Sequence, residues 1–193
     1  MTDAALLDLF RRSGALLDGH FRLSSGLHSG AYLQCALVLQ EPAEAEAVGR
    51  ALADSVRELR PNVVLSPALG GIIIGHEVAR ALGVRAVFAE RQDGVLTLRR
   101  GFTISPSDRV LVVEDVLTTG GSTRETIAVA NASGAQVVGV ASIVDRSGGA
   151  ARFDVPLRSL VDVAVSLYDA DACPWCSKGI PVVKPGSRGG GET

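Results

Sequence analysis

Short, almost entirely apolar runs alternate with segments of helical length through the middle of the chain. Strands are predicted at residues 63–65, 84–89, 110–113 and 136–144. Helices are predicted at residues 72–82, closed by Gly83, and at residues 122–133, ended by Gly134. Strands that are apolar on both sides must be covered on both faces. The alternation therefore predicts an α/β fold, with a parallel sheet of about four or five strands flanked by helices.

The N-terminal third follows a different pattern. An amphipathic helix is predicted at residues 2–17, short strands and turns at 21–39, and an alanine-rich helix at 41–59. We expect these segments to form a small hood over the carboxyl edge of the sheet. A length of 193 residues suits a single domain. We divide it into an N-terminal hood (about 1–60), an α/β core (61–170) and a C-terminal tail (171–193).

Composition narrows the environment in which such a chain works. Apolar residues make up 47%, charged residues 21%, and the net charge is −2. We therefore expect a folded chain with no general attraction to nucleic acid or to an anionic membrane. The opening MTDAALLDLF has no basic region of a signal peptide, and no apolar run reaches the roughly 18–20 residues of a membrane span. An odd count of 3 cysteines argues against a disulfide framework and favours the cytoplasm.

The segment RVLVVEDVLTTGGST, residues 109–123, carries the strongest functional signal. Its strand is expected to end at the carboxyl edge of the sheet, where open α/β folds bind ligands. The hydroxyls and glycines that follow precede a helix. Such a turn directs several amide N–H groups and the positive helix end at one point, which predicts a phosphate-binding loop. The loop lacks the lysine of nucleoside triphosphatases, so triphosphate hydrolysis is disfavoured.

Glu114 and Asp115, at the exit of this strand, would repel a phosphate placed directly on them. Two adjacent carboxylates can accept hydrogen bonds from the hydroxyls of a neighbouring vicinal diol. Alternatively, they can hold Mg²⁺ through water. Phosphate beside a diol is the pattern of a ribose 5-phosphate. The alternative interpretation, in which the acids cap a helix and the glycines form an ordinary turn, needs no ligand.

This segment resembles the signature of the type I phosphoribosyltransferases, which bind 5-phosphoribosyl 1-diphosphate. Further stretches resemble the orotate phosphoribosyltransferases within that group. They are GHFRLSSGLHSGAYLQ (19–34), SPALGGIIIG (66–75), AERQDGVLTLRRGF (89–102) and VDRSGG (144–149). In that family they correspond to an N-terminal segment, the diphosphate-binding loop, a mobile catalytic loop and the segment whose arginine faces the pyrimidine. The chain departs from the family in having Ser24 and Gly70 where many relatives have lysine, and in a shorter catalytic loop.

The resemblance implies transfer of ribose 5-phosphate from 5-phosphoribosyl 1-diphosphate to orotate, giving orotidine 5′-phosphate and diphosphate in pyrimidine synthesis. It implies catalytic roles for Arg91, Glu114 and Asp115. The residues expected to bind substrate are these three with Val116, Leu117, Thr118, Thr119, Gly120, Gly121, Ser122, Arg146, Leu69, Gly70, Ser24 and Tyr32. Mg²⁺ is expected to bind mainly through the diphosphate, so no residue is predicted as a direct metal ligand. A homodimer is also implied, with residues 90–102 reaching toward the partner's site.

Arg146 follows a buried strand at the sheet edge that carries the phosphate-binding loop. Its planar guanidinium can hold a carboxylate through two parallel hydrogen bonds, which suits the carboxylate of orotate. A salt bridge with Asp145 or a loop cap is the alternative. Arg99 and Arg100 are weaker candidates than Arg91 for contacting the diphosphate.

Two other functions stay open: a regulator that binds 5-phosphoribosyl 1-diphosphate as an effector, and a transferase for a purine base. The first is disfavoured because the sequence shows no helix-turn-helix segment and has no positive net charge. The N-terminal segment disfavours the second.

The stretch Cys173-Pro174-Trp175-Cys176 resembles half of a zinc knuckle. A tetrahedral site needs four ligands, and the sequence shows no second Cys pair or nearby His pair. A packing role for this stretch is therefore favoured over metal binding. His76 is predicted to be structural, and His28, in the N-terminal segment that resembles the family, is not predicted to be catalytic.

Overall fold

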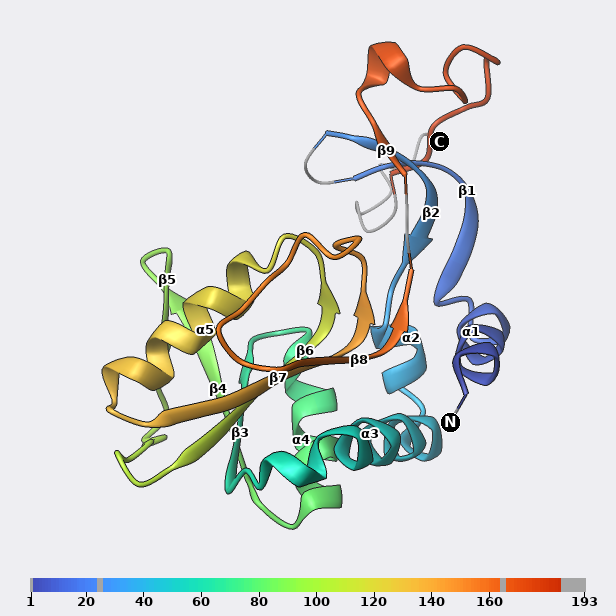
Figure 1. The fold of residues 1–193 in the computed structure, drawn as a ribbon. Helices are drawn as coiled ribbons and strands as arrows, with labels where there is room; N and C mark the ends of the chain where they lie inside the picture. The colour runs from blue at the N-terminus through green and yellow to red at the C-terminus, as the bar shows by residue number, and fades with distance from the viewer. Residues whose placement is uncertain (1, 24–25, 164–165, 185–193) are drawn as a thin grey trace.

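The central feature of the fold is a six-stranded sheet in the order β5-β4-β3-β6-β7-β8 (Figure 1). This computed structural model describes residues 2–23, 26–163 and 166–184. The parallel strands are β3 (Val63–Pro67), β4 (Arg85–Gln92), β6 (Arg109–Leu117), β7 (Gln136–Asp145) and β8 (Leu157–Asp162). The short strand β5 (Val95–Leu98) pairs antiparallel with β4 at one edge. The predicted α/β fold with a largely parallel sheet is confirmed.

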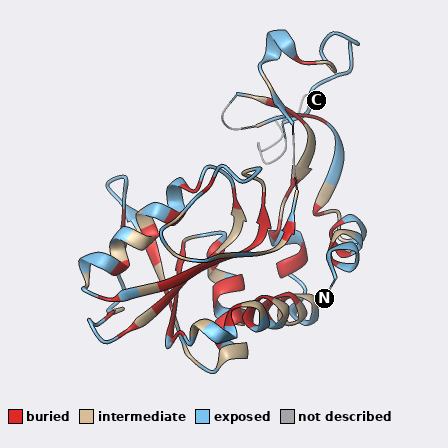
Figure 2. Ribbon diagram, in the orientation of Figure 1, coloured by how far each residue is buried: buried red, intermediate tan, exposed pale blue. Residues whose placement is uncertain are grey.

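Helices cover both faces of this sheet, as the apolar pattern predicted. The helices α3 (Pro42–Val56) and α4 (Gly71–Leu82) pack on one face, and α5 (Gly121–Ala132) packs on the other. Successive side chains of a strand point to opposite faces. Along β6, Leu111 and Val113 therefore join the core under α3 and α4, while Val110 and Val112 join the core under α5. Figure 2 shows the buried residues concentrated in this sheet and on the helix sides that face it.

A second, three-stranded sheet forms the hood. Its order is β1-β2-β9, all antiparallel, with β1 at Leu16–Arg22, β2 at His28–Leu33 and β9 at Leu167–Tyr168. Because β8 ends at Asp162 and β9 begins at Leu167, the hood stands beyond the carboxyl edge of the core sheet, as Figure 1 shows. The remaining elements are the short helix α2 (Ala36–Leu39) and the 3-10 turns η1 (Arg57–Leu59) and η2 (Ala170–Ala172).

The N-terminal segments differ from the prediction in two respects. The first helix, α1 (Asp3–Arg12), ends five residues before the predicted residue 17. Gly14 has a φ of 69°, which ends the helix, and Leu16 already lies in β1. The helix predicted at 41–59 was expected in the hood, but α3 packs against α4 and the core sheet. Its buried stripe, which includes Val48, Leu52 and Val56, fills the core instead of covering the carboxyl edge.

Three strands were absent from the prediction, and β6 is longer than predicted. Residues 89–102 were expected as a loop, but they form the β4–β5 hairpin around Asp93 and Gly94, both with positive φ. β8 and β9 were also missed. β6 continues past Val113 to Leu117. Glu114 and Asp115 therefore lie within the last residues of the strand and not in the loop after it. In the part of the chain that the structure describes, every helix is too short or too polar to span a bilayer.

Candidate active site at the carboxyl edge of the sheet

The order β3-β6-β7 brings three predicted binding segments to one place. Parallel neighbours end at the same edge of a sheet, so the loops after β3, β6 and β7 are adjacent. The register confirms this, because Leu117 at the end of β6 lies beside Asp145 at the end of β7. The amide of Arg146 donates to the carbonyl of Leu117 at 2.7 Å. Residues 69–70, 118–122 and 146 therefore surround the carboxyl end of β6.

The segment between β6 and α5 has the form of a phosphate cradle; we name residues 118–122 the phosphate loop. A cavity of about 60 Å³ opens there, lined by Glu114 and residues 116–123. Gly120 precedes the helix with a φ of 76°, a conformation that favours glycine. No side chain caps the N-terminus of α5 among the described residues. Its first amide groups are therefore free to donate to an anion, in the field of the positive helix end.

Glu114 and Asp115 point to opposite sides of β6, because they are successive residues of a strand. Thr123 donates its hydroxyl to Glu114 Oε2 at 3.1 Å. The Val116 amide donates to Asp115 Oδ1 at 2.8 Å. The Thr123 hydroxyl therefore holds Glu114 in position and does not point to the phosphate loop as a donor.

The two carboxyl groups are mostly buried, and this changes their acidity. Burial, followed by the neighbouring charge of Asp115, raises the pKa of Glu114 to about 7. Burial also raises the pKa of Asp115. Close to neutral pH, a ligand that supplies hydroxyl donors or positive charge will favour the ionised pair. The ribose hydroxyls of the predicted substrate are such donors.

Gly70 lies directly against Asp115. A Cβ added at Gly70 would come within 2.8 Å of both carboxylate oxygens of Asp115. The lack of a side chain at Gly70 therefore lets the loop backbone lie directly against the Asp115 carboxylate, and a larger residue here would require a shift. Leu69, the preceding residue, is 84% exposed at the tip of the loop. The predicted diphosphate loop and the predicted diol ligand thus meet at one point.

Arg146 is half-buried on the other side of the phosphate loop. Burial lowers the pKa of Arg146, while the nearby Cys35 and Tyr32 favour its charged form. Its Nε is buried without a hydrogen-bond partner. Asp145, the alternative partner, accepts from the Ser147 amide at 2.7 Å, and no ion pair to Arg146 is found among the described residues. The structure therefore places Arg146 near Tyr32 and leaves its buried Nε donor without a partner among the described residues.

Arg91, by contrast, is occupied. It forms a two-pronged ion pair with Glu125 of α5, at 2.8 and 3.0 Å, and donates to the Gly94 carbonyl at 2.6 Å. Arg99 and Arg100 both pair with Glu90. Neither pairing is visible in the sequence, because the partners lie on different elements or across a hairpin. Ser24, predicted to bind substrate, lies outside the described residues.

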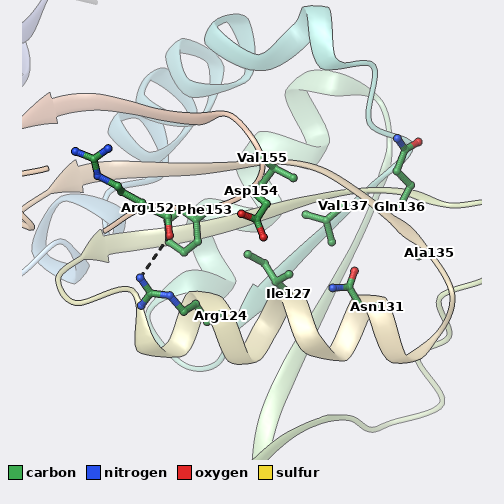
Figure 3. A pocket seen from close by; sticks show the side chains of 10 residues that line it. All are labelled: Arg124, Ile127, Asn131, Ala135, Gln136, Val137, Arg152, Phe153, Asp154 and Val155. Atoms are coloured by element: carbon green, nitrogen blue, oxygen red, sulfur yellow. Dashed lines mark hydrogen bonds between the residues drawn. The ribbon is translucent and has the colours of Figure 1, made fainter. Parts of the chain in front are cut away.

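A larger cavity of about 400 Å³ lies beside α5 and contains none of the predicted site residues (Figure 3). Arg124 closes one end of it, with its guanidinium 5.3 Å from the centre of the Phe153 ring and bonds to the carbonyls of Thr119 and Arg152. The lining residues are Arg124, Ile127, Asn131, Ala135, Gln136, Val137, Arg152, Phe153, Asp154 and Val155. This cavity is larger than the one at the phosphate loop. It lacks the N-terminus of a helix and the two carboxylates of Glu114 and Asp115, which we name the acid pair.

Comparison with known proteins agrees with this geometry. The family of the phosphoribosyl transferase domain matches residues 36–168. The chain is 55% identical to the orotate phosphoribosyltransferase of Carboxydothermus hydrogenoformans over 185 residues, covering 95% of this chain and 97% of that protein. It is 53% identical to the same enzyme of Pelotomaculum thermopropionicum over 188 residues, covering 97% and 99%.

Solved structures give the same result. The orotate phosphoribosyltransferase of Mycobacterium tuberculosis H37Rv, crystallised with 5-phospho-alpha-D-ribosyl 1-diphosphate, superposes with a TM-score of 0.66 at 28% identity, covering 84% of this chain and 96% of that chain. An adenine phosphoribosyl transferase from Trypanosoma brucei, 20% identical with a TM-score of 0.60 over 80% of this chain and 79% of that one, shares the fold. The chain therefore belongs to the orotate phosphoribosyltransferases, within the phosphoribosyltransferase domain family.

Proposed function

We propose that this chain transfers ribose 5-phosphate from 5-phosphoribosyl 1-diphosphate to orotate, giving orotidine 5′-phosphate and diphosphate on the route to UMP. The observation that carries the proposal is the meeting of the phosphate loop, the acid pair, the 69–70 loop and Arg146 around the end of β6. Near-complete coverage by relatives that share about half of its residues supports it.

The phosphate loop and the acid pair hold the ribose 5-phosphate. Amides at the start of α5, with the hydroxyls of Thr118, Thr119 and Ser122, donate to the 5-phosphate. Glu114 and Asp115 accept the ribose hydroxyls, and the bond from Thr123 keeps Glu114 turned toward them. Since these carboxylates are ionised in the complex, they also stabilise positive charge that develops on the ring.

We place the diphosphate and Mg²⁺ at the exposed loop of residues 69–70, beside Asp115. Gly70 brings the loop backbone against the Asp115 carboxylate, so backbone groups and a carboxylate share one exposed edge that diphosphate oxygens and a hydrated cation can approach. Oxygen donors from a carboxylate and from substrate phosphates fit Mg²⁺. When bound, Mg²⁺ neutralises charge on the leaving diphosphate. Asp115 would hold it through water, while the exposed loop at Leu69 and Gly70 offers backbone groups to the diphosphate.

Arg146 and Tyr32 form the orotate side of the site. The half-buried guanidinium, whose Nε has no partner, suits the orotate carboxylate, since a charged acceptor compensates a partly desolvated cation. Breaking of the bond between C1 and the diphosphate oxygen leaves an oxocarbenium-like centre. N1 of orotate gives up its proton to the departing diphosphate or to water and forms the new bond to C1. The chain's tasks are to position both substrates and to stabilise these charges, so no covalent nucleophile is needed.

Arg91 requires a change of partner to act on the diphosphate. Its ion pair with Glu125 is exposed, and such pairs are weak enough to exchange for a more highly charged ligand. We propose that the β4–β5 hairpin moves when substrate binds and that it acts across the interface of a homodimer. We further propose that the enzyme works in the cytoplasm, where a reducing environment keeps its free cysteines as thiols.

The test is to incubate the protein with 5-phosphoribosyl 1-diphosphate, Mg²⁺ and, separately, orotate, uracil, adenine and guanine, and to separate the nucleotides formed. We expect one orotidine 5′-phosphate and one diphosphate per turnover with orotate, and no nucleotide from the other bases. Turnover of adenine or guanine would overturn the choice of base. Tight binding of 5-phosphoribosyl 1-diphosphate without turnover of any base would favour the regulator. Omission of Mg²⁺, with excess chelator, should abolish turnover and tests the proposed metal.

A further inference from the structure

Four side chains that could bind a metal meet in the hood, away from the phosphate loop. His20 comes from β1, His28 opens β2, and Cys173 and Cys176 follow η2; we name these residues the His–Cys cluster. One ligand atom from each lies within 4.8 Å of every other. In Figure 1 the strands β1 and β2 and the segment after β9 lie together at the top of the molecule. No histidine pair is near the two cysteines in the sequence, but the fold brings His20 and His28 beside them.

The distances within the His–Cys cluster match a tetrahedral site. The sulfur–nitrogen separations are 3.4 Å from Cys173 Sγ to His20 Nε2, and 3.7 and 3.3 Å from Cys176 Sγ to His20 Nε2 and His28 Nδ1. With zinc bonds of about 2.3 Å to sulfur and about 2.0–2.1 Å to nitrogen, a tetrahedron separates S and N by about 3.5 Å. The two nitrogens are 2.8 Å apart, and would move apart by about 0.5 Å around an ion.

The tautomer of His20 leaves a lone pair for a ligand. Its Nδ1 lies 2.8 Å from the carbonyl oxygen of Ile180. A carbonyl can only accept, so Nδ1 carries the proton and the unprotonated Nε2 faces the cluster. Zinc-bound histidines are commonly oriented in this way, by a bond from the other ring nitrogen to a carbonyl. His20, His28 and Cys173 are buried, so water reaches few of these polar atoms.

The local backbone folds tightly around the two cysteines. The Ser177 amide donates to the Cys173 carbonyl at 3.1 Å, and the Gly179 amide to the Cys176 carbonyl at 2.9 Å. Gly179 has a φ of 67°, which turns the chain back toward β1. Trp175, between the cysteines, stacks on His20 with 6.0 Å between ring centroids. Its ring also occupies the space over Gly30, where a Cβ would lie 2.5 Å from it. The turn is thus packed against both strands that carry the histidines.

We propose that His20, His28, Cys173 and Cys176 bind one Zn²⁺ ion as a structural site. Two thiolates and two imidazoles in a tetrahedral arrangement favour zinc, and four protein ligands leave no open position for catalysis. The ion joins the C-terminal segment to β1 and β2. The backbone continues this attachment, since the Arg22 amide donates to Val183 and the Val183 amide donates to His20, both at 2.8 Å.

The first experiment measures metal in untagged protein purified without chelator, by inductively coupled plasma mass spectrometry. We expect about one zinc per chain in the wild type and less than about a tenth in Cys176→Ser and His28→Gln. The matched controls are Cys35→Ala and His76→Gln, which change the same residue types outside the cluster and should keep the zinc. Wild-type protein without bound metal that also fails to bind added zinc would overturn the proposal.

A second measurement does not depend on whether a variant folds. Wild-type protein stripped with chelator and reloaded with Co²⁺ should show the sulfur-to-metal charge-transfer band and the visible bands of a tetrahedral cobalt–thiolate site. Octahedral bands alone would contradict the proposal. Hydrogen exchange at the Arg22 and Val183 amides should quicken on stripping and slow again with zinc, while amides of β6 stay unchanged.

Discussion

The phosphate loop and the His–Cys cluster both gather a few polar side chains, but the chain assembles them in opposite ways. Glu114 and the phosphate loop are nearly consecutive, on one strand, one turn and one helix. His20 and Cys173 are 153 positions apart and meet only because the C-terminal segment returns to β1. A site formed by residues that are adjacent in the sequence can be recognised from the sequence. A site formed by residues that only the tertiary fold brings together cannot. If the two regions are independent, a substitution in one should leave the other intact.

The largest expected effect is loss of activity on removing both carboxylates of the acid pair. Glu114→Gln with Asp115→Asn deletes charge-assisted bonds to the ribose hydroxyls, each contributing about 1.5–3 kcal/mol. We expect kcat/KM for 5-phosphoribosyl 1-diphosphate to fall by about two to four powers of ten, with a higher KM and a lower kcat. Steady-state kinetics measures this. The double variant Asp54→Asn with Glu58→Gln, on the exposed side of α3 and η1, is the control.

The same acid-pair variant should retain its circular dichroism spectrum and its zinc. Loss of zinc together with activity would show that the two regions are one cooperative unit. Unchanged kinetics would remove the acid pair from the site.

The second effect is on stability and depends on pH. The pKa of Glu114 rises from 4.5 to about 7 on folding, so the unfolded chain releases this proton at lower pH than the folded chain. Folding stability from this group is therefore full below pH 4.5 and decreases as pH rises to about 7. Between those limits the ligand-free wild type should lose about 2–3 kcal/mol more than Glu114→Gln. Urea denaturation of both proteins at pH 5 and pH 8 gives the difference. Parallel profiles would mean that Glu114 is not destabilised by burial.

The third prediction concerns the orotate side of the site. Arg146→Ala removes one charge-assisted contact, which contributes about 1.5–3 kcal/mol. We expect kcat/KM for orotate to fall by about one to two powers of ten, while the Kd of 5-phosphoribosyl 1-diphosphate, measured alone by calorimetry, changes little. Arg152→Ala, an exposed arginine at the larger cavity, should leave both values unchanged. If Arg146→Ala binds orotate normally and loses the diphosphate substrate, Arg146 belongs to the diphosphate side.

The smallest effect is expected from the exposed ion pair that holds Arg91. Glu125→Gln frees the guanidinium, and exposed pairs contribute little to stability. The KM for 5-phosphoribosyl 1-diphosphate should stay the same or fall, by no more than about threefold. Glu46→Gln, which breaks a similar pair on α3, is the control. A large loss of activity in Glu125→Gln alone would show that the ion pair belongs to the active arrangement.

The central part of the fold could be predicted because its signal is local. β3, β6 and β7 are apolar on both faces, and such runs between helices have few alternatives to a parallel sheet. Gly83 and Gly134 end their helices with a positive φ. Because glycine favours this conformation, the helix ends can be recognised from the sequence. The placement of Glu114, Gly70 and Arg146 at one edge followed from this order of strands.

The missing elements are those whose stability comes from partners far along the chain. β8 carries Arg158, Ser159 and Asp162 because it is an edge strand, so its apolar pattern is weak. β9 has two residues and exists only by pairing with β2. The pairing of Arg91 with Glu125 and the contact of His20 with Cys176 likewise depend on tertiary approach. Periodicity within a short window cannot show either of them.

The return of the C-terminal segment to β1 has a consequence for synthesis on the ribosome. β1 is translated early, yet its partner Val183 and the cysteines of the His–Cys cluster are among the last described residues to emerge. Residues 42–162 can bury the core sheet between α3, α4 and α5 while the remaining chain is still being made. The hood cannot form before Cys176 and Val183 have been made, so His20 and His28 lack these partners while the core sheet is being synthesised. Formation of the hood is therefore a later step than assembly of the core sheet.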